Sequence, residues 1–359
     1  MTDDVYRRLA TRVDEIPNGF PATESGVELR LLAKMFTPEE AQVASVMRLT
    51  PEPAAEIALR AGADQETGLG HLQAMADKGL IIVNRTEDEP AFSLMPFIVG
   101  FYEAWLTRMD EEYASLFEAY YQETRAGMLG ESPSVHRVIP IELAIPFEVE
   151  IFPYERASAL LERAKSWGVR DCICRVQKTL IGQACGHPVE NCLIFAPVES
   201  AYEGSEDIRP LTKEEALGVL REAEEAGLVH SSGNYRRGNT YICNCCTCGC
   251  GVMRGIAEFG IQTAVARSAF RAIVEIETCI GCGTCLDRCQ FAALSLSDGK
   301  AHIYPDVCAG CGLCVTTCPA EALHLERRPE DETSKPPATL RHWMKERAEA
   351  RGITMEGIV

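Results

Sequence analysis

The stretch that decides the fold is CIGCGTCLDRC, residues 279–289, which returns 29 positions later as CAGCGLCVTTC, residues 308–318. Both copies space their cysteines as C-x2-C-x2-C-x3-C. The residues that follow also repeat, because Ala293-Leu294 corresponds to Ala322-Leu323. Glycines keep the loops free of side chains and permit positive φ angles, at Gly281, Gly283, Gly310 and Gly312. The repeat therefore predicts two similar loops, each of which aims several thiolates at one point.

The rest of the composition narrows what these thiolates do. The chain has 359 residues, a formal charge of −18 and 17 cysteines, all of them between Cys172 and Cys318. The acidic first residues predict no secretory signal, so we expect a reducing, cytoplasmic location in which clustered cysteines bind metals. Hydropathy predicts no membrane insertion. The acidic charge disfavours nucleic acid as a partner.

The repeated spacing is that of bacterial [4Fe–4S] sites. We expect the first three cysteines of each copy to hold one cluster, and the fourth to open a short helix and ligate the other cluster. The expected ligand sets are Cys279, Cys282, Cys285 and Cys318 for one cluster, and Cys308, Cys311, Cys314 and Cys289 for the second. Zinc is disfavoured here, since zinc sites pair cysteines rather than present triplets. Apolar shielding of the clusters is expected from Ile280, Leu286, Phe291, Leu313 and Val315.

Residues 272–326 thus resemble the bacterial ferredoxins that carry two [4Fe–4S] clusters. One position departs from that family. Cys318 is followed by Pro319, as in the family, whereas Cys289 is followed by Gln290. The ligands are unaffected, but we expect a different turn and different hydrogen bonds after Cys289, and hence an altered reduction potential.

Nine cysteines lie upstream of the repeat and form a second problem: Cys172, Cys174, Cys185, Cys192, Cys243, Cys245, Cys246, Cys248 and Cys250. On an extended backbone the two thiols of a C-x-C unit point the same way, while those of adjacent Cys245 and Cys246 point apart and can serve different sites. We expect one or two further iron–sulfur clusters, with zinc as the alternative metal and redox-active or buried thiols as the third interpretation. Arg175 and Lys178 are candidates for neutralising a cluster; His187 is expected to be a loop residue rather than a ligand.

Two upstream segments, Arg170-Asp-Cys-Ile-Cys-Arg175 and Cys243-Asn-Cys-Cys246, stand in front of the ferredoxin repeat. Together with Pro96-Phe-Ile-Val-Gly100, this arrangement is similar to a group of 4Fe-4S binding proteins from anaerobic and redox-versatile bacteria and archaea. The resemblance covers most of the chain. It implies electron transfer and says little about a substrate.

The N-terminal part contains no cysteine and is rich in helix signals. We expect helices over residues 23–34, 37–49, 50–62 and 64–79, then strands 80–83 and 91–94, an order typical of a winged-helix module, followed by a long helix over 98–124. Residues 64–79 and the turn 84–90, the two elements that would face DNA, are net negative. DNA binding is therefore disfavoured, and docking or scaffolding is favoured.

The predicted fold class is α+β multidomain: a winged-helix-like helical domain, a central Cys-rich α+β region and a dicluster ferredoxin-like domain. We expect edge strands within 138–153, a helix over 154–167 that Gly168 ends, a capped helix over 212–227, and a charged helix over 338–350. The predicted segments are a helical arm (1–36), the winged-helix-like domain (37–97), a long helix and connection (98–135), the Cys-rich region (136–271), the ferredoxin domain (272–326), and a linker with a charged tail (327–359).

The predicted function is the transfer of single electrons through two [4Fe–4S] clusters and at least one upstream cluster, to or from a partner oxidoreductase. The chain contains no Rossmann or P-loop motif, and we assign no catalytic residue. A homo-oligomer or a subunit of a complex is expected. Two alternatives remain open at this point: a redox-sensing winged-helix regulator, and an oxidoreductase subunit with a catalytic upstream cluster.

Overall fold

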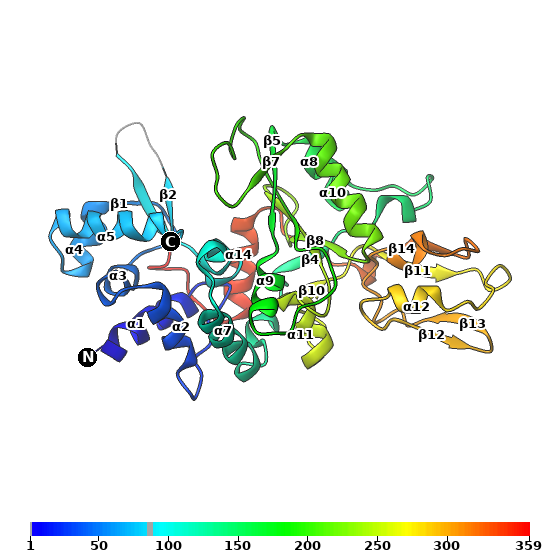
Figure 1. Ribbon diagram of the computed structural model, residues 1–359, viewed down its shortest axis with the longest axis horizontal. Helices are drawn as coiled ribbons and strands as arrows, with labels where there is room; N and C mark the ends of the chain where they lie inside the picture. Colours follow the sequence, from blue (N-terminus) through cyan, green and yellow to red (C-terminus); the bar gives the residue numbers. More distant parts are fainter. Residues whose placement is uncertain (1, 85–88) are drawn as a thin grey trace. The chain divides into compact units, whose positions relative to one another are not determined.

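The computed structural model describes residues 2–84 and 89–359 (Figure 1). The chain divides into two compact units. The first comprises residues 1–128, 177–183 and 344–359, and the second comprises residues 129–176 and 184–343. Among the helices of the described residues, none is both long and apolar enough to cross a membrane.

The first unit is mainly helical and carries a small sheet in the order β1-β3-β2. Its elements are α1 (Thr2–Asp14), α2 (Val27–Met35), α3 (Pro38–Ala44), β1 (Glu52–Pro53), α4 (Ala54–Ala61), α5 (Gln65–Asp77), β2 (Ile81–Asn84), β3 (Ala91–Leu94), α6 (Tyr102–Ala104) and α7 (Glu111–Glu123). Side-chain caps begin several helices, as the sequence predicts. Thr37 and Glu40 form a capping box on α3, and Asp64 accepts a hydrogen bond from the Thr67 amide at the start of α5.

An aromatic core holds this unit together. Phe97 is fully buried; its ring centroid lies 4.8 Å from that of Phe20, and Tyr102 stacks on Phe117 at 4.2 Å. The buried Arg347 donates to the backbone carbonyls of Pro17 and Met128. The sequence predicted a charged, solvated tail after residue 327, but this arginine is completely buried and belongs to the core.

Three predicted helices of this unit have different bounds. The helix expected from residue 23 begins at Val27, because Gly26 adopts a left-handed conformation with φ 68°. The helix expected over 37–49 ends at Ala44. The helix expected over 50–62 begins only at Ala54, because Glu52 and Pro53 pair with β3 instead.

The long helix predicted over 98–124 is wrong. Ile98, Val99 and Gly100 lie outside helical φ and ψ, within a turn over Phe97–Phe101, and a 3₁₀ turn follows at Leu106–Arg108. The regular helix α7 starts only after Asp110, whose carboxylate accepts a hydrogen bond from the Tyr113 amide. The acidic turn predicted at 84–90 falls largely on residues 85–88, which lie outside the described residues.

The second unit contains a seven-stranded sheet in the order β10-β4-β8-β9-β6-β5-β7. Its strands are β4 (His136–Val138), β5 (Ser166–Asp171), β6 (Glu190–Ala196), β7 (Arg209–Leu211), β8 (Val229–Gly233), β9 (Tyr241–Cys245) and β10 (Val265–Ala266). Its helices are α8 (Ala157–Glu162), α9 (Ile173–Leu180, which extends into the first unit), α10 (Lys213–Glu225) and α11 (Gly251–Phe259), and α14 (Leu340–Ala350) bridges the unit boundary. The predicted capping box of Thr212 and Glu215 begins α10.

The helix predicted over 154–167 is wrong in its C-terminal part. A 3₁₀ turn covers Pro153–Glu155 and an α-helix covers Ala157–Glu162, whereas Trp167 and Gly168 lie in strand β5, paired with both β6 and β7. Gly168 does not end a helix. A Cβ there would collide with the Ile208 side chain, so this glycine is required by close packing within the sheet.

The ferredoxin part of this unit is built from two similar halves. Its elements are β11 (Phe270–Val274), α12 (Thr284–Arg288), β12 (Leu294–Ser297), β13 (Lys300–Ile303), α13 (Leu313–Thr316) and β14 (Leu323–Arg327). Strand β11 pairs antiparallel with β14, and β12 pairs antiparallel with β13 (Figure 1). The fourth cysteine of the first copy was expected to open a helix, but Cys289 follows the end of α12.

The capping box of α3 gives a test of the first unit. Glu40 is buried, accepts from the Thr37 amide at 2.8 Å and pairs with Lys78 at 2.6 Å. Replacing Glu40 with Ala removes the cap partner and leaves the partly exposed ammonium group of Lys78 without its carboxylate, so we expect the free energy of unfolding to fall by about 1–3 kcal/mol. Chemical denaturation followed by circular dichroism measures this loss.

The matched control is Glu56→Ala, which removes an exposed glutamate from the first turn of α4. Its effect should stay within about 0.5 kcal/mol. Equal effects of the two substitutions would contradict a structural role for the Glu40 pair.

Candidate metal centres

Two cavities in the ferredoxin part are lined by the repeated cysteines. Cys279, Cys282 and Cys285 line one cavity together with Cys318 from the other copy. The second cavity is lined by Cys289 together with the first three cysteines of the second copy, Cys308, Cys311 and Cys314. The structure therefore brings together the same two sets of four thiols that the spacing predicts, with one cysteine exchanged between the halves.

Glycines shape the two loops at the positions where the chain passes another backbone. Gly281 has φ 68°, and a Cβ there would collide with the carbonyl oxygen of Gly299. Gly310 has φ 69°, and a Cβ there would collide with the carbonyl oxygen of Phe270. Both positions thus combine a left-handed backbone with a close approach that excludes any side chain.

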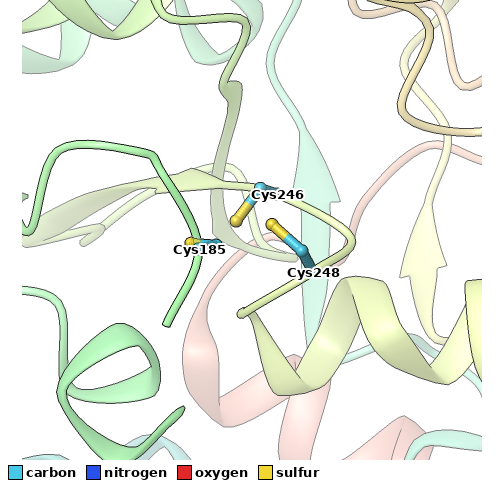
Figure 2. Close-up of side chains that lie close together, drawn as sticks. All are labelled: Cys185, Cys246 and Cys248. Carbon is cyan, nitrogen blue, oxygen red and sulfur yellow. The ribbon is translucent and has the colours of Figure 1, made fainter. Parts of the chain in front are cut away.

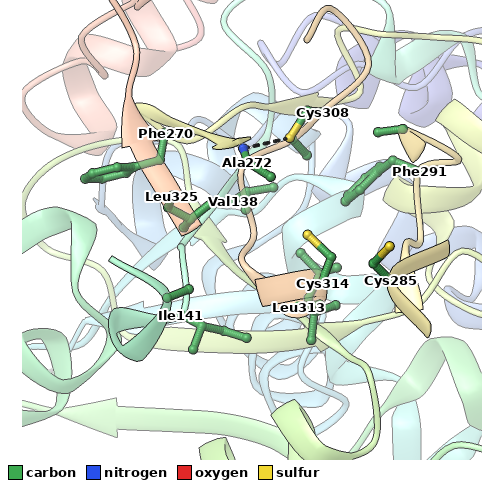
Figure 3. Close-up of a cluster of buried hydrophobic side chains, with 14 of the residues drawn as sticks. Val138, Ile141, Phe270, Ala272, Cys285, Phe291, Cys308, Leu313, Cys314 and Leu325 are labelled. Atoms are coloured by element: carbon green, nitrogen blue, oxygen red, sulfur yellow. Dashed lines mark hydrogen bonds between the residues drawn. The ribbon is translucent and has the colours of Figure 1, made fainter. Parts of the chain in front are cut away.

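Backbone amides point at the cysteine sulfurs in a symmetric pattern. The amides of Ala293 and Ala322 donate to the Sγ atoms of Cys289 and Cys318, both at 3.3 Å. The Ala272 amide donates to Cys308 Sγ at 3.5 Å (Figure 3), and the Ala301 amide donates to Cys279 Sγ at 3.4 Å. Such N–H···S hydrogen bonds stabilise negative charge on sulfur.

Apolar side chains surround these thiols unevenly. Leu313 is fully buried and Phe291 is 7% exposed, and both line the second cavity (Figure 3). Ile280 lines the first cavity but is 67% exposed. Cys282 is exposed as well, whereas Cys314 is buried. The second cavity is therefore the better shielded of the two.

Gln290, the residue that departs from the ferredoxin pattern, links the repeat to the upstream cysteines. Its Oε1 atom accepts hydrogen bonds from the amide and the hydroxyl of Thr247, both at 3.0 Å, and its amide nitrogen donates to Gly227. Thr247 lies between Cys246 and Cys248. Proline, which follows Cys318 in the second copy, offers no side-chain acceptor for these bonds.

Six of the nine upstream cysteines lie on the seven-stranded sheet or close to it in the chain. Strands β5, β6 and β9 are neighbours, and Leu193 pairs with Ile242, so Cys192 and Cys243 lie beside each other. Each thiol is hydrogen-bonded to the next in a chain of six, in the order Cys192, Cys243, Cys245, Cys250, Cys174 and Cys172. We call these residues the six-thiol set.

The local backbone of this set differs partly from the expectation. Cys243 and Cys245 lie on the extended strand β9, as predicted for a C-x-C unit. Cys172 follows β5 directly and Cys174 already belongs to helix α9, yet their thiols still meet. Hydrogen bonds from the Cys243 and Cys250 thiols lower the pKa of Cys245 to about 5. These hydrogen bonds favour the thiolate form of Cys245 within the buried set.

The three remaining thiols form a separate group. Cys185, Cys246 and Cys248, which we call the three-thiol set, have Sγ atoms that all lie within 4.8 Å of one another (Figure 2). Cys246 is buried and Cys248 is exposed. Adjacent Cys245 and Cys246 thus belong to different sets, as expected from side chains that point to opposite sides of an extended chain.

Arg175 stands beside the three-thiol set. Its guanidinium donates to Cys246 Sγ at 3.5 Å and to the backbone carbonyl of Asn244 at 2.9 Å, and the residue is 2% exposed. Burial opposes its charge, but the negative charges of Cys172 and Cys246 outweigh burial and raise the Arg175 pKa. The predicted neutralising role fits this arginine.

The other two candidates, Lys178 and His187, have hydrogen-bond partners of their own. Lys178 pairs with Glu118 at 3.4 Å and with the side chain of Gln183. The ring of His187 is hydrogen-bonded to the backbone of Ala226. The charge of Lys178 is paired with that of Glu118, and the loop role predicted for His187 agrees with its contact.

A polar network around the cysteines escaped sequence reasoning. Asn244 is 2% exposed, donates to the Asn191 carbonyl at 2.6 Å and bonds His230 at 2.6 Å. The hydroxyl of Ser231 lies 3.5 Å from Cys245 Sγ. The only signal in the sequence is that both asparagines directly neighbour cysteines, in Cys243-Asn-Cys245 and Asn191-Cys192.

Comparison with known proteins identifies one part of the chain. Residues 278–322 match the family described as the 4Fe-4S dicluster domain, so the chain carries a dicluster ferredoxin domain that binds 4Fe-4S clusters. No curated protein matches the chain, and no solved structure does. The upstream cysteines and the N-terminal unit must therefore be interpreted from their own geometry.

The contact between Gln290 and Thr247 can be tested through its hydrogen bonds. Replacing Gln290 with Ala leaves the part-buried Thr247 amide without its acceptor, a loss worth about 1–3 kcal/mol. We expect hydrogen–deuterium exchange at this amide to become about 5–100 times faster. Mass spectrometry of the peptide that contains residues 246–250 measures the change.

Gln65→Ala, an exposed substitution on α5, is the matched control and should leave that peptide unchanged. Unchanged exchange in Gln290→Ala as well would show that the glutamine does not hold the upstream loop.

Proposed function

We propose that this protein transfers single electrons, using two [4Fe–4S] clusters in the ferredoxin domain and at least one further cluster on the six-thiol set. The observation that carries the proposal is the pair of four-cysteine cavities with exchanged Cys289 and Cys318. Four cysteine thiolates are the ligand set of a [4Fe–4S] cluster. When bound, such clusters supply one-electron chemistry at low potential.

The chain's own residues prepare these cavities for negatively charged groups. Amides of four alanines donate to cysteine sulfurs, and the buried side chains of Phe291 and Leu313 line the cavity of Cys308. Hydrogen bonds to sulfur and exclusion of water act on the reduction potential in opposite directions. The more exposed first cavity, with Cys282 at its rim, is suited to exchange electrons with a partner.

The six-thiol set supports the further cluster. It lies in the same apolar core as the ferredoxin cysteines, because Cys245, Cys250, Cys308 and Cys314 all belong to one buried group. Six thiols exceed the four that a single [4Fe–4S] cluster requires. Soft thiolate ligands in this number favour iron–sulfur chemistry over oxygen-ligated metals.

For the three-thiol set we propose a single metal ion rather than a cluster. Tetrahedral zinc holds thiolates at about 2.3 Å, which separates the sulfurs by about 3.8 Å. The three Sγ atoms lie within 4.8 Å of one another, and no other set of three or more metal-ligating side chains in the described residues meets that criterion, those of the ferredoxin cavities included. The positive charge of Arg175 balances three thiolates and a divalent ion.

The proposed partner is a redox protein with a positively charged surface. The chain's charge of −18 would attract such a surface and repel nucleic acid. The helix-rich N-terminal unit is proposed as a winged-helix-like docking module. Helix α5 contains no lysine or arginine, and the neighbouring Lys78 is bound to Glu40. These features support a protein-docking role over the DNA-regulator alternative.

Metal analysis of anaerobically purified protein tests the cluster assignment. We expect more than about eight irons and matching sulfide per chain, since two [4Fe–4S] clusters account for eight. Cys192→Ser should remove iron from the six-thiol set and leave the ferredoxin signals in electron paramagnetic resonance spectra unchanged, whereas Cys282→Ser should alter those signals. Fewer than about eight irons in the unaltered protein would contradict the proposal.

The three-thiol set has its own test, in which two exposed cysteines serve as a matched pair. Cys248→Ser should lower bound zinc by about one ion per chain and leave iron and sulfide unchanged, because Cys248 belongs to the three-thiol set. Cys282→Ser should lower iron and leave zinc unchanged. A loss of iron from Cys248→Ser would show instead that these thiols bind a cluster.

A further inference from the structure

A cavity in the second unit is not accounted for by electron transfer. It has a volume of about 570 Å³, within the range typical of small-molecule sites. Five basic and three acidic side chains line it, so its wall is net positive in a chain whose total charge is −18. The basic residues are Arg137, Arg267, Arg327, Arg328 and Lys335, and the acidic residues are Glu150, Glu155 and Glu330.

Arg137 is the most unusual residue of this wall. It lies on strand β4 and is only 4% exposed, and its Nε and one terminal nitrogen have no hydrogen-bond partner within the described residues. Its guanidinium carbon stands 5.8 Å from the centre of the Tyr154 ring. Burial lowers the Arg137 pKa to about 10, and the charge of Glu155 opposes that shift only in part.

A buried guanidinium with two unpaired nitrogens is costly, and a bound anion would offset that cost. Nearby carboxylates do not fill this role. The charge of Glu155 favours the Arg137 cation, but its carboxylate is bound to Arg327 at 2.8 Å. Arg267 is exposed and adds a second positive charge to the same cavity. The donor pair thus suits an oxyanion, which a planar guanidinium binds through two parallel hydrogen bonds.

Aromatic rings define the other part of the cavity. The rings of Phe152 and Tyr154 are nearly parallel, with an angle of 6° and centroids 5.7 Å apart. Phe152 is 39% exposed, so part of its ring is free to contact a ligand. Arg327 stands 5.2 Å from the centre of this ring. A ligand with a flat apolar portion and an anionic end would satisfy both sides of the cavity.

The floor of the cavity is bonded to the loop of the second cysteine site. Arg328 donates to the Cys308 carbonyl at 2.6 Å and to the Phe270 carbonyl at 3.0 Å. Ser268 donates to the Gly310 carbonyl at 2.7 Å. Ser268 and Arg328 therefore separate a charge placed in the cavity from the Cys308 loop that they support.

We propose that this cavity binds a small organic anion, a carboxylate or phosphate with a flat apolar portion, through Arg137 and Arg267. The site goes beyond the proposed electron-transfer function, since binding needs no electron. Negative charge near a cluster opposes its reduction, so a bound anion lowers the potential of the cluster on the Cys308 side. By linkage, the reduced protein binds the anion more weakly.

The test uses calorimetry and thermal unfolding of the full, oxidised protein. The probes are benzene-1,3,5-tricarboxylate and inorganic pyrophosphate, with the uncharged benzene-1,3,5-trimethanol and sodium chloride of equal ionic strength as controls. We expect at least one anion to bind and to raise the unfolding temperature, and neither control to do so. The two anions also distinguish carboxylate from phosphate recognition. Binding of neither anion overturns the proposal.

Variants decide whether the named arginines form the site. Arg137→Met should weaken anion binding at least about tenfold, and without anion it should be no less stable than the unaltered protein. Arg221→Met, an exposed arginine of α10 in the same unit, should bind like the unaltered protein. Affinity that survives Arg137→Met overturns the assignment. If that variant does not fold, the exposed Arg267→Met decides, and unchanged affinity there has the same consequence.

A redox titration monitored by electron paramagnetic resonance separates this proposal from the electron-transfer proposal. The bound anion should shift one cluster potential to a more negative value in the unaltered protein and not in Arg137→Met. Calorimetry on oxidised protein remains informative if no cluster transfers electrons, so each proposal can fail without the other.

Discussion

The exchange of one cysteine between the two halves of the ferredoxin domain is the constraint on which the second unit depends. Neither loop lines a complete cavity alone, because Cys318 completes the first cavity and Cys289 completes the second. Each half must therefore fold against the other before four thiols meet. The paired strands β11 with β14 and β12 with β13 fix that arrangement, and Gly281 and Gly310 allow the close backbone approaches it requires.

A sheet performs the same task for the upstream cysteines. Strand order, rather than sequence spacing, places Cys192 beside Cys243. It also places the end of β5, just before Cys172, beside Cys192. The alternation of side chains along β9 then assigns Cys243 and Cys245 to one set, while Cys246 falls into the other. Two groups of thiols thus arise from one short segment, and Gln290 connects that segment to the ferredoxin domain through Thr247.

The parts that were predictable from sequence are those fixed by local rules. The ligand spacing of the repeat, the capping boxes at Thr37 and Thr212 and the hairpin after α5 all depend on residues close together in the chain. The failures depend on distant partners. The local pattern predicts Trp167 at the end of an amphipathic helix, but Trp167 lies in a strand that pairs with β6 and β7. Likewise, the pairing of nine cysteines follows from a strand order that no local pattern encodes.

The distribution of charge connects the sites. An acidic chain that gathers thiolates must place cations close to them, and here the buried arginines do so: Arg175 contacts Cys246, and Arg328 supports the Cys308 loop. Arg175 also donates to the Pro188 carbonyl and the Asn191 side chain, and Arg328 donates to the Phe270 carbonyl. Arg137 is equally buried but lacks such partners within the described residues. Arg175 and Arg328 donate from their terminal nitrogens to fixed protein acceptors, whereas a bound anion would supply an acceptor to Arg137.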